Sequence, residues 1–441
     1  MINILILLFL LLLITYRYEK GFIVFASFFF FAQSIPSGIG NATIYFIVTM
    51  YLLLIYWIRK LKRKEKSNMP FPKIWINSIL LLSVCCLITE FVSGFKNYQG
   101  WVNLVVSSFV FPFLLWKFIN SPQRLQKLIK GLKTSLFIIV LYAIIEQLIH
   151  SNPLSQLLYP SDETTYAKNV LGELAFRYGL YRCKSLLVFS STLGCFGITM
   201  AYLFFQVKNM TNYFQYKNKS RLSNYKLLLL LSFIAIAFST TRSVFLVTFI
   251  IAMGCILQYR NSISKSNTSI YIIGILGLIF FFLGGGDDLI NTMFGSMNKN
   301  NIGSSPEMRM NQLDISLYYF NQSPIWGNGL NYIFKVVSEQ DPDIYGAESI
   351  WFQLLVNYGI VGCITYTIFV FTIGKKLWTY NKYFIIFPLA IFIGKTTSIL
   401  MDVEYDYYLY VAIMIIKIYT YKNYLRKQKY PNIPISQSSI N

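Results

Sequence analysis

Residues 350–374 read IWFQLLVNYGIVGCITYTIFVFTIG, an apolar run that carries no charged side chain. An α-helix rises about 1.5 Å per residue, so this run can cross the roughly 30 Å hydrocarbon core of a bilayer. Similar runs recur along the whole chain. The thirteen candidate spans are 2–16, 21–36, 42–58, 74–92, 101–119, 132–150, 184–206, 227–241, 243–259, 269–284, 350–374, 383–400 and 405–420.

The composition of the 441 residues supports a membrane protein. Hydrophobic residues make up 55% of the chain, charged residues only 13%, and the mean hydropathy is +0.51. A soluble protein of this size could not bury so much apolar surface in one core. We therefore expect an all-α integral membrane protein with about 12–13 transmembrane helices, forming a single polytopic domain over residues 1–441.

The distribution of positive charge predicts how the chain crosses the membrane. The formal net charge is +21, and 29 of the 39 lysines and arginines fall in alternate loops, such as 59–73. Because cytoplasmic loops are enriched in Lys and Arg, we expect the N-terminus outside and the C-terminus inside. No basic run is interleaved with a folded polar segment, so the charge indicates membrane lipids rather than nucleic acid as partners.

The cysteines and the single histidine predict no metal site and no cofactor. Six cysteines are present without any Cys-x-x-Cys spacing, and most lie inside apolar runs. His150 is the only histidine, which argues against a His-based metal centre.

Two long loops are expected on the outside, at 151–183 and 284–349. In the second, Ser305 and Pro306 have the signature of a helix start. The helix that follows would carry an apolar stripe beside a polar stripe that includes Arg309 and Gln312. We expect this helix to lie on the membrane surface and to present Arg309 toward a site.

Arg242 is the first candidate site residue. It stands in Ser239-Thr240-Thr241-Arg242-Ser243, a turn between two apolar helices. One interpretation is an interfacial arginine whose stem lies along apolar surface. The other is an anion clamp, because the guanidinium fork matches phosphate oxygens bidentately.

Further candidates flank the seventh predicted span and the large loop. Arg177, Arg182 and Lys184 would either contact lipid headgroups or add phosphate ligands. Glu348 stands where a helix begins, and would either complement the helix dipole or act as a general base. Lys395 lies inside the twelfth predicted span and needs a partner there. The sequence leaves Glu146 and His150 open as that partner.

Three segments together resemble the O-antigen polymerase and O-antigen ligase superfamily. The first is the Ser/Thr-Arg-Ser turn at Arg242. The second is Arg309 followed by Ser-Pro-Ile-Trp-Gly-Asn-Gly-Leu at 323–330. The third is the helix 348–362, which leaves the large loop and reads ESIWFQLLVNYGIVG. The ligases usually carry a histidine where Glu348 stands, so the sequence is more similar to the polymerase branch.

The resemblance implies glycosyl transfer at the outer face of the bacterial cytoplasmic (inner) membrane. The expected substrate is an oligosaccharide repeat unit on undecaprenyl pyrophosphate, joined into capsular, exo- or O-antigen polysaccharide without a metal ion. Glu348, Arg242 and Arg309 are the expected catalytic residues. The expected substrate-binding residues are Arg177, Arg182, Lys184, Gln312 and Lys395. A flippase and a chain-length regulator are the expected protein partners.

Two alternative functions remain at this point. One is a ligase that moves finished glycan to another acceptor. The other is a flippase for the lipid-linked oligosaccharide. A transporter of that kind would carry charges around a cavity at the membrane midplane, whereas here they gather toward the outside.

Overall fold

The computed structural model describes residues 2–32, 35–39, 42–63, 70–158, 176–177, 180–187, 189–208, 225–259, 306–341, 344, 349–397 and 404–429. A small antiparallel hairpin joins β1 (Phe176–Arg177) to β2 (Leu180–Tyr181). The helices of the first half are α1 (Ile2–Tyr16), α2 (Tyr18–Ser27), α3 (Phe29–Ala32), α4 (Ile44–Arg63), α5 (Lys73–Val92), α6 (Tyr98–Val105), the π-helix η1 (Val106–Val110), α7 (Phe111–Phe118), α8 (Pro122–Ile149) and α9 (Pro153–Leu158). Those of the second half are α11 (Ser190–Lys208), α13 (Tyr225–Ser239), α14 (Arg242–Tyr259), α17 (Pro306–Gln322), the π-helix η2 (Ile333–Val337), α18 (Ser338–Gln340), α19 (Ile350–Trp378), the 3-10 helix η4 (Lys382–Ile385), α20 (Ile386–Thr397) and α21 (Glu404–Lys429).

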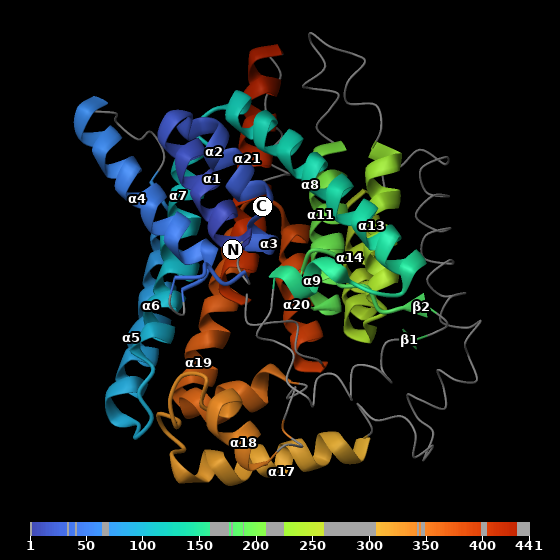
Figure 1. The fold of residues 1–441 in the computed structure, drawn as a ribbon. Helices are drawn as coiled ribbons and strands as arrows, with labels where there is room; N and C mark the ends of the chain where they lie inside the picture. Colours follow the sequence, from blue (N-terminus) through green and yellow to red (C-terminus); the bar gives the residue numbers. More distant parts are fainter. Residues whose placement is uncertain are drawn as a thin grey trace.

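Long apolar helices dominate the described part of the chain (Figure 1). Six of them are long and apolar enough to cross a membrane, and three shorter apolar helices accompany them. Many large apolar side chains face outward, and those of Phe9, Leu80 and Phe371 are all more than half exposed. Such side chains suit a lipid solvent, so the expected all-α integral membrane protein is confirmed.

The helix boundaries differ from the predicted spans in several places. The span predicted at 21–36 divides at Phe28 into α2 and α3. The span predicted at 132–150 begins earlier, at Pro122, so basic residues assigned to a loop lie on the first turns of α8. The span predicted at 269–284 lies outside the described residues.

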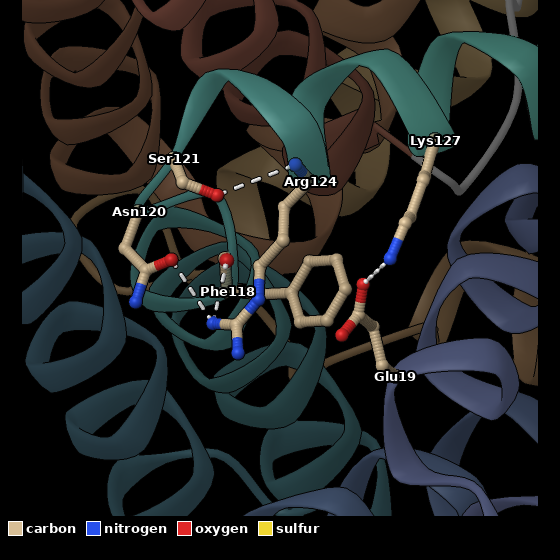
Figure 2. A network of polar contacts seen from close by, with 6 residues as sticks. All are labelled: Glu19, Phe118, Asn120, Ser121, Arg124 and Lys127. Carbon is tan, nitrogen blue, oxygen red and sulfur yellow. Dashed lines mark hydrogen bonds and ion pairs between the residues drawn. The ribbon is translucent and has the colours of Figure 1, made fainter.

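A polar network holds the start of α8 against α2 and α7 (Figure 2). Ser121 accepts a hydrogen bond at 3.3 Å from the backbone N–H of Arg124, whose guanidinium donates to Asn120 at 3.0 Å. The ammonium of Lys127 lies 2.5 Å from the carboxylate of Glu19 and lowers the pKa of that carboxyl. Both partners are substantially exposed, so this pair adds little to stability. We call this end of the bundle the basic end.

Helix α11 packs against α13, α14 and α21 and is buried along almost its whole length. It approaches α13 closely because Gly197 has no side chain. A Cβ there would lie 2.8 Å from the carbonyl oxygen of Ser232. On another side of the core, the Tyr410 hydroxyl of α21 donates to the carbonyl of Ala26 at 3.0 Å. Segments from both halves of the sequence therefore share one core.

Helix α19 is broken, although the sequence predicted one continuous span over 350–374. At Gly359 the backbone has φ 63° and ψ −162°, a conformation that glycine adopts most readily. The segment 323–331 supplies partners to backbone groups at the break; the N–H of Ile360 donates to the carbonyl of Pro324 at 2.9 Å. A helix inside a membrane protein can be interrupted only where such partners exist.

A small helical unit, made of residues 306–341 and 344, packs against the first half of α19. We call it the α17 unit, and the end of the bundle beside it the α17 end. In Figure 1, α17 runs crosswise beneath the bundle, with α18 next to it. The start of α17 at Pro306 agrees with the sequence prediction, while Ser305 lies outside the described residues. The unit shares with α19 a second buried cluster, which consists of Tyr319, Ile333, Val337, Ile344 and Val356.

Candidate functional site

The turn between α13 and α14 carries the first candidate, Arg242. Ser239 and Thr240 are fully buried, and Thr240 has a positive φ of 46° that tightens the turn. The turn can approach α11 because of Gly194, where a Cβ would lie 2.6 Å from the side chain of Val244. Arg242 is the first residue of α14 and is only partly buried. Its guanidinium is therefore rooted at a rigid, tightly packed helix start.

The segment after β2 lies against this same turn. The backbone N–H of Cys183 donates to the carbonyl of Phe238 at 3.0 Å, four residues before Arg242. Arg182 and Lys184 flank Cys183 on either side and are both partly exposed. The structure thus brings the backbone of these two predicted cations next to the Arg242 turn. Arg177 forms β1 on the same hairpin, and its side chain lies outside the described part.

A buried carboxylate holds that segment in place. Glu146, near the end of α8, is fully buried and accepts hydrogen bonds from the backbone N–H groups of Lys184 at 3.1 Å and Ser185 at 2.6 Å. Ser185 has a positive φ of 58°, so the chain turns sharply between these two bonds and α11. Burial, together with the Glu146 charge, raises the pKa of the Cys183 thiol well above its usual value. Cys183 therefore stays a neutral packing residue.

Lys395 lies in the last turn of α20 and has only 1% of its surface exposed. Its ammonium lies 4.9 Å from the ring centroid of Tyr408 on α21, a cation–π distance. Helix α20 packs against α14, which begins with Arg242. The sequence left Glu146 and His150 open as partners of Lys395. Of these two, Glu146 accepts its hydrogen bonds from the backbone N–H groups of Lys184 and Ser185.

Helix α17 presents Arg309 as an exposed side chain and buries its polar stripe. Gln312 and Ser316 are fully buried, whereas Met310 and Leu317 are 58% and 40% exposed. Because α17 packs on α19, the polar stripe faces the protein and the apolar stripe faces outward. Gln312 is thus placed in a protein interface of the α17 unit, while Arg309 lies exposed in the first turn of the helix.

The hydroxyl of Tyr319 joins α17 to the end of α18. It donates to the carboxylate of Asp341 at 2.8 Å, and the side-chain oxygen of Gln340 lies at the same distance. Burial and the bond to Asp341 raise the pKa of Tyr319 to about 12. This contact fixes the α17 unit internally.

Two buried polar side chains near the α17 end have no hydrogen-bond partner within the described structure. They are the hydroxyl of Ser243, directly after Arg242, and the amide nitrogen of Gln353, in the first turn of α19. Buried polar groups nearly always form hydrogen bonds, so these two groups beside the candidate residues offer donors for a ligand. Sequence reasoning passed over both of them. Their positions inside the segments that resemble the superfamily were the available signal.

Glu348, the predicted general base, lies outside the described residues. Among the residues described, no group of three or more His, Cys, Asp or Glu side chains could hold a metal ion.

Residues 227–367 match a protein-family model described as O-antigen ligase. The matched segment covers α13, the Arg242 turn, α14, α17 and the broken part of α19. The resemblance to the superfamily of O-antigen ligases and polymerases is therefore confirmed on the segments that suggested it. A comparison with curated proteins found no match.

Proposed function

From the O-antigen ligase domain at residues 227–367, we propose that this multi-pass membrane protein joins oligosaccharide repeat units carried on undecaprenyl pyrophosphate. The family domain supports glycan transfer as the general activity. The observation that carries the finer proposal is the gathering of cationic residues at the α17 end. Arg182 and Lys184 are tied next to the Arg242 turn, and Lys395 is buried in the helix that packs on α14.

The proposed reaction is a substitution at the anomeric carbon of the donor glycan. An acceptor sugar hydroxyl forms the new glycosidic bond, the bond from the anomeric carbon to the pyrophosphate oxygen breaks, and the lipid pyrophosphate leaves. Glu348 takes the proton of the hydroxyl. Negative charge develops on the leaving pyrophosphate, and preorganised donors placed there lower the barrier most.

Arg242 and Arg309 are the proposed pyrophosphate ligands, together with Arg182 or Arg177. A guanidinium binds phosphate oxygens through two parallel hydrogen bonds and remains charged at any physiological pH. Arg242 projects from the tightly packed start of α14, and Arg309 is an exposed side chain in the first turn of α17. In this proposal the two bind the same pyrophosphate, Arg242 from the bundle and Arg309 from the α17 unit.

Two buried polar groups, the hydroxyl of Ser243 and the amide nitrogen of Gln353, extend the proposed site toward the sugars. Ser243 and Gln353 retain donors that are not used within the described structure. A glycan offers many hydroxyl oxygens as acceptors, which would pair these groups. Lys395 would add positive charge to the site from the last turn of α20.

The proposed orientation places the α17 end outside the cytoplasmic membrane and the basic end inside. Lysines and arginines gather at the start of α8 and at the end of α19, as expected for cytoplasmic ends. A flippase would then deliver the lipid-linked glycan, and a chain-length regulator would act on the growing polymer.

Deletion of the gene in its native host tests this proposal. Loss of long polysaccharide together with accumulation of single lipid-linked repeat units is the expected result. Restoration by the wild-type chain, but not by one with Arg242→Ala, would support it. Normal polysaccharide in the deletion strain would overturn it.

A ligase activity is the second candidate, favoured by the description of the matching family. A ligase moves finished glycan to a different acceptor. In that case the deletion strain would accumulate long glycan on the carrier lipid instead of single units. The length of the lipid-linked glycan therefore separates the two activities.

A further inference from the structure

Glu90 is a fully buried carboxylate at the end of α5 that the proposed reaction does not use. One oxygen accepts a hydrogen bond from the backbone N–H of Leu330 at 2.7 Å, and the other accepts one from the N–H of Asn97. A buried charge is costly unless hydrogen bonds compensate it, and bonds to an ionised acceptor are stronger than neutral ones. The carboxylate thus holds two chain segments that lie 233 residues apart.

The contacts around Glu90 fasten the same loop to α5. The hydroxyl of Thr89 donates to the carbonyl of Trp326 at 2.7 Å, and the side-chain amide of Asn97 donates to the carbonyl of Leu330 at 3.1 Å. Gly329 has φ 120°, and a Cβ there would lie 2.8 Å from the carbonyl oxygen of Phe95. The loop therefore lies directly on the end of α5, with its glycine at the closest approach.

The opposite side of the loop holds the α17 unit. The side chain of Asn328 donates to the carbonyl of Tyr319, on α17, at 2.8 Å. The N–H of Asn328 also bonds the carbonyl of Val356 at 2.9 Å, on the first half of the broken helix α19. The loop 326–330 thus works as a latch between α5, α17 and α19, through its backbone groups and the side chain of Asn328. Its glycines serve close packing.

We propose that Glu90 is a positioning residue, whose buried carboxylate locks the 326–330 loop and thereby sets where α17 holds Arg309 at the α17 end. Glu90 does not touch the substrate in this proposal. The activity consequence rests on the proposed function. The positional consequence does not, because it concerns only the placement of the α17 unit.

The substitution Glu90→Gln isolates the effect, because glutamine has the same shape. Its amide keeps one acceptor oxygen but turns an NH₂ group toward the second backbone donor, so one hydrogen bond is lost. The matched control is Glu339→Gln, an exposed carboxylate in the α17 unit itself. Both variants should insert normally, which membrane levels on a blot would check.

The first measurement is the distance between spin labels at Asn321 on α17 and Leu148 on α8, by pulsed electron resonance. The six native cysteines are replaced beforehand. Wild type and Glu339→Gln should give the same narrow distribution, and Glu90→Gln a clearly broadened or shifted one. An unchanged distribution in Glu90→Gln would overturn the proposal, whatever the activity of the protein.

The second measurement is a double-mutant cycle on glycan transfer with Arg309→Ala. Glu90→Gln alone should slow transfer at least about tenfold, and should add less than about twofold when Arg309 is already absent, because coupled residues are not additive. Equal slowing in both backgrounds would show that Glu90 does not act through Arg309. A wild-type rate in Arg309→Ala would instead contradict the proposed role of Arg309 in the reaction. The spin-label distances would still test whether Glu90 positions the α17 unit.

Discussion

Replacing Gly359 by alanine tests whether the break in α19 holds the α17 unit in place. The glycine has φ 63° and ψ −162°, a backbone conformation that costs a residue with a Cβ about 1–3 kcal/mol. An added Cβ would also lie 2.5 Å from the carbonyl oxygen of Ile325 and 2.7 Å from that of Pro324. Those contacts are with backbone, so the two segments must move apart.

That movement would lengthen two hydrogen bonds across the break. They run from Ile360 N–H to the carbonyl of Pro324 at 2.9 Å and from Val361 N–H to the carbonyl of Ile325 at 3.3 Å. Each contributes about 1 kcal/mol, so with the strain the total loss is about 3–5 kcal/mol. Because about 1.4 kcal/mol corresponds to a factor of ten, local opening of the α17 unit should become at least about 100-fold more frequent.

Hydrogen exchange followed by mass spectrometry measures this opening in the purified protein. Peptides that cover 323–331 and 356–361 should exchange faster in Gly359→Ala by that factor. The control is Gly94→Ala, because a Cβ at Gly94 meets no atom within 4 Å. Exchange in Gly359→Ala that equals the wild-type rate would refute the argument that the break is held by these contacts.

Three further outcomes are expected. Glu348→Gln should keep normal membrane levels but stop glycan joining, because an amide cannot take the proton of the acceptor hydroxyl; long glycan in this variant would place the base elsewhere. A cysteine at Asn321 should react with an impermeant maleimide in intact cells and one at Lys62 should not, whereas the opposite pattern would reverse the orientation. The α17 unit should lose stability as the pH rises from about 10 to about 12, because burial and Asp341 raise the pKa of Tyr319 to about 12, so the folded state holds its proton longer than the unfolded state. Thermal unfolding across this pH range should show the loss in wild type and a smaller one in Tyr319→Phe.

Local sequence patterns predicted the membrane helices, the start of α17 and the turn before Arg242. Apolar runs long enough to span a bilayer identify helices without knowledge of their neighbours, because the solvent is the lipid itself. The start of α17 at Pro306 and the turn before Arg242 depend on adjacent residues, so they could also be read from the sequence.

The features that assemble the site depend on contacts between distant segments, which one sequence does not reveal. Glu90 and Glu146 each stand near the end of an apolar run, where a charged residue is a signal of function. Nothing in the sequence, however, indicates that each accepts backbone N–H groups from a remote loop. The break at Gly359 was missed for the same reason, since its partners lie in the segment 323–331.

The predicted start of α8 was also wrong. The lysines of its first turns were assigned to a loop because charge in a membrane helix is costly. In the structure α8 begins at Pro122, with Ser121 capping it, and its basic turns form the end of the bundle. The basic residues still lie on one side of the predicted topology, because the end of a helix can hold cations at a membrane interface as well as a loop can.

The rate at which the purified protein, in vesicles, consumes an oligosaccharide linked to undecaprenyl pyrophosphate tests the central claim most directly when wild type is compared with Arg242→Lys. Lysine keeps the positive charge but lacks the bidentate fork that matches the pyrophosphate oxygens. The expected result is a loss of about 100-fold or more, similar to the removal of one donor from an oxyanion hole. Equal rates at equal amounts of folded protein would contradict the assignment of Arg242 as a ligand of the leaving group.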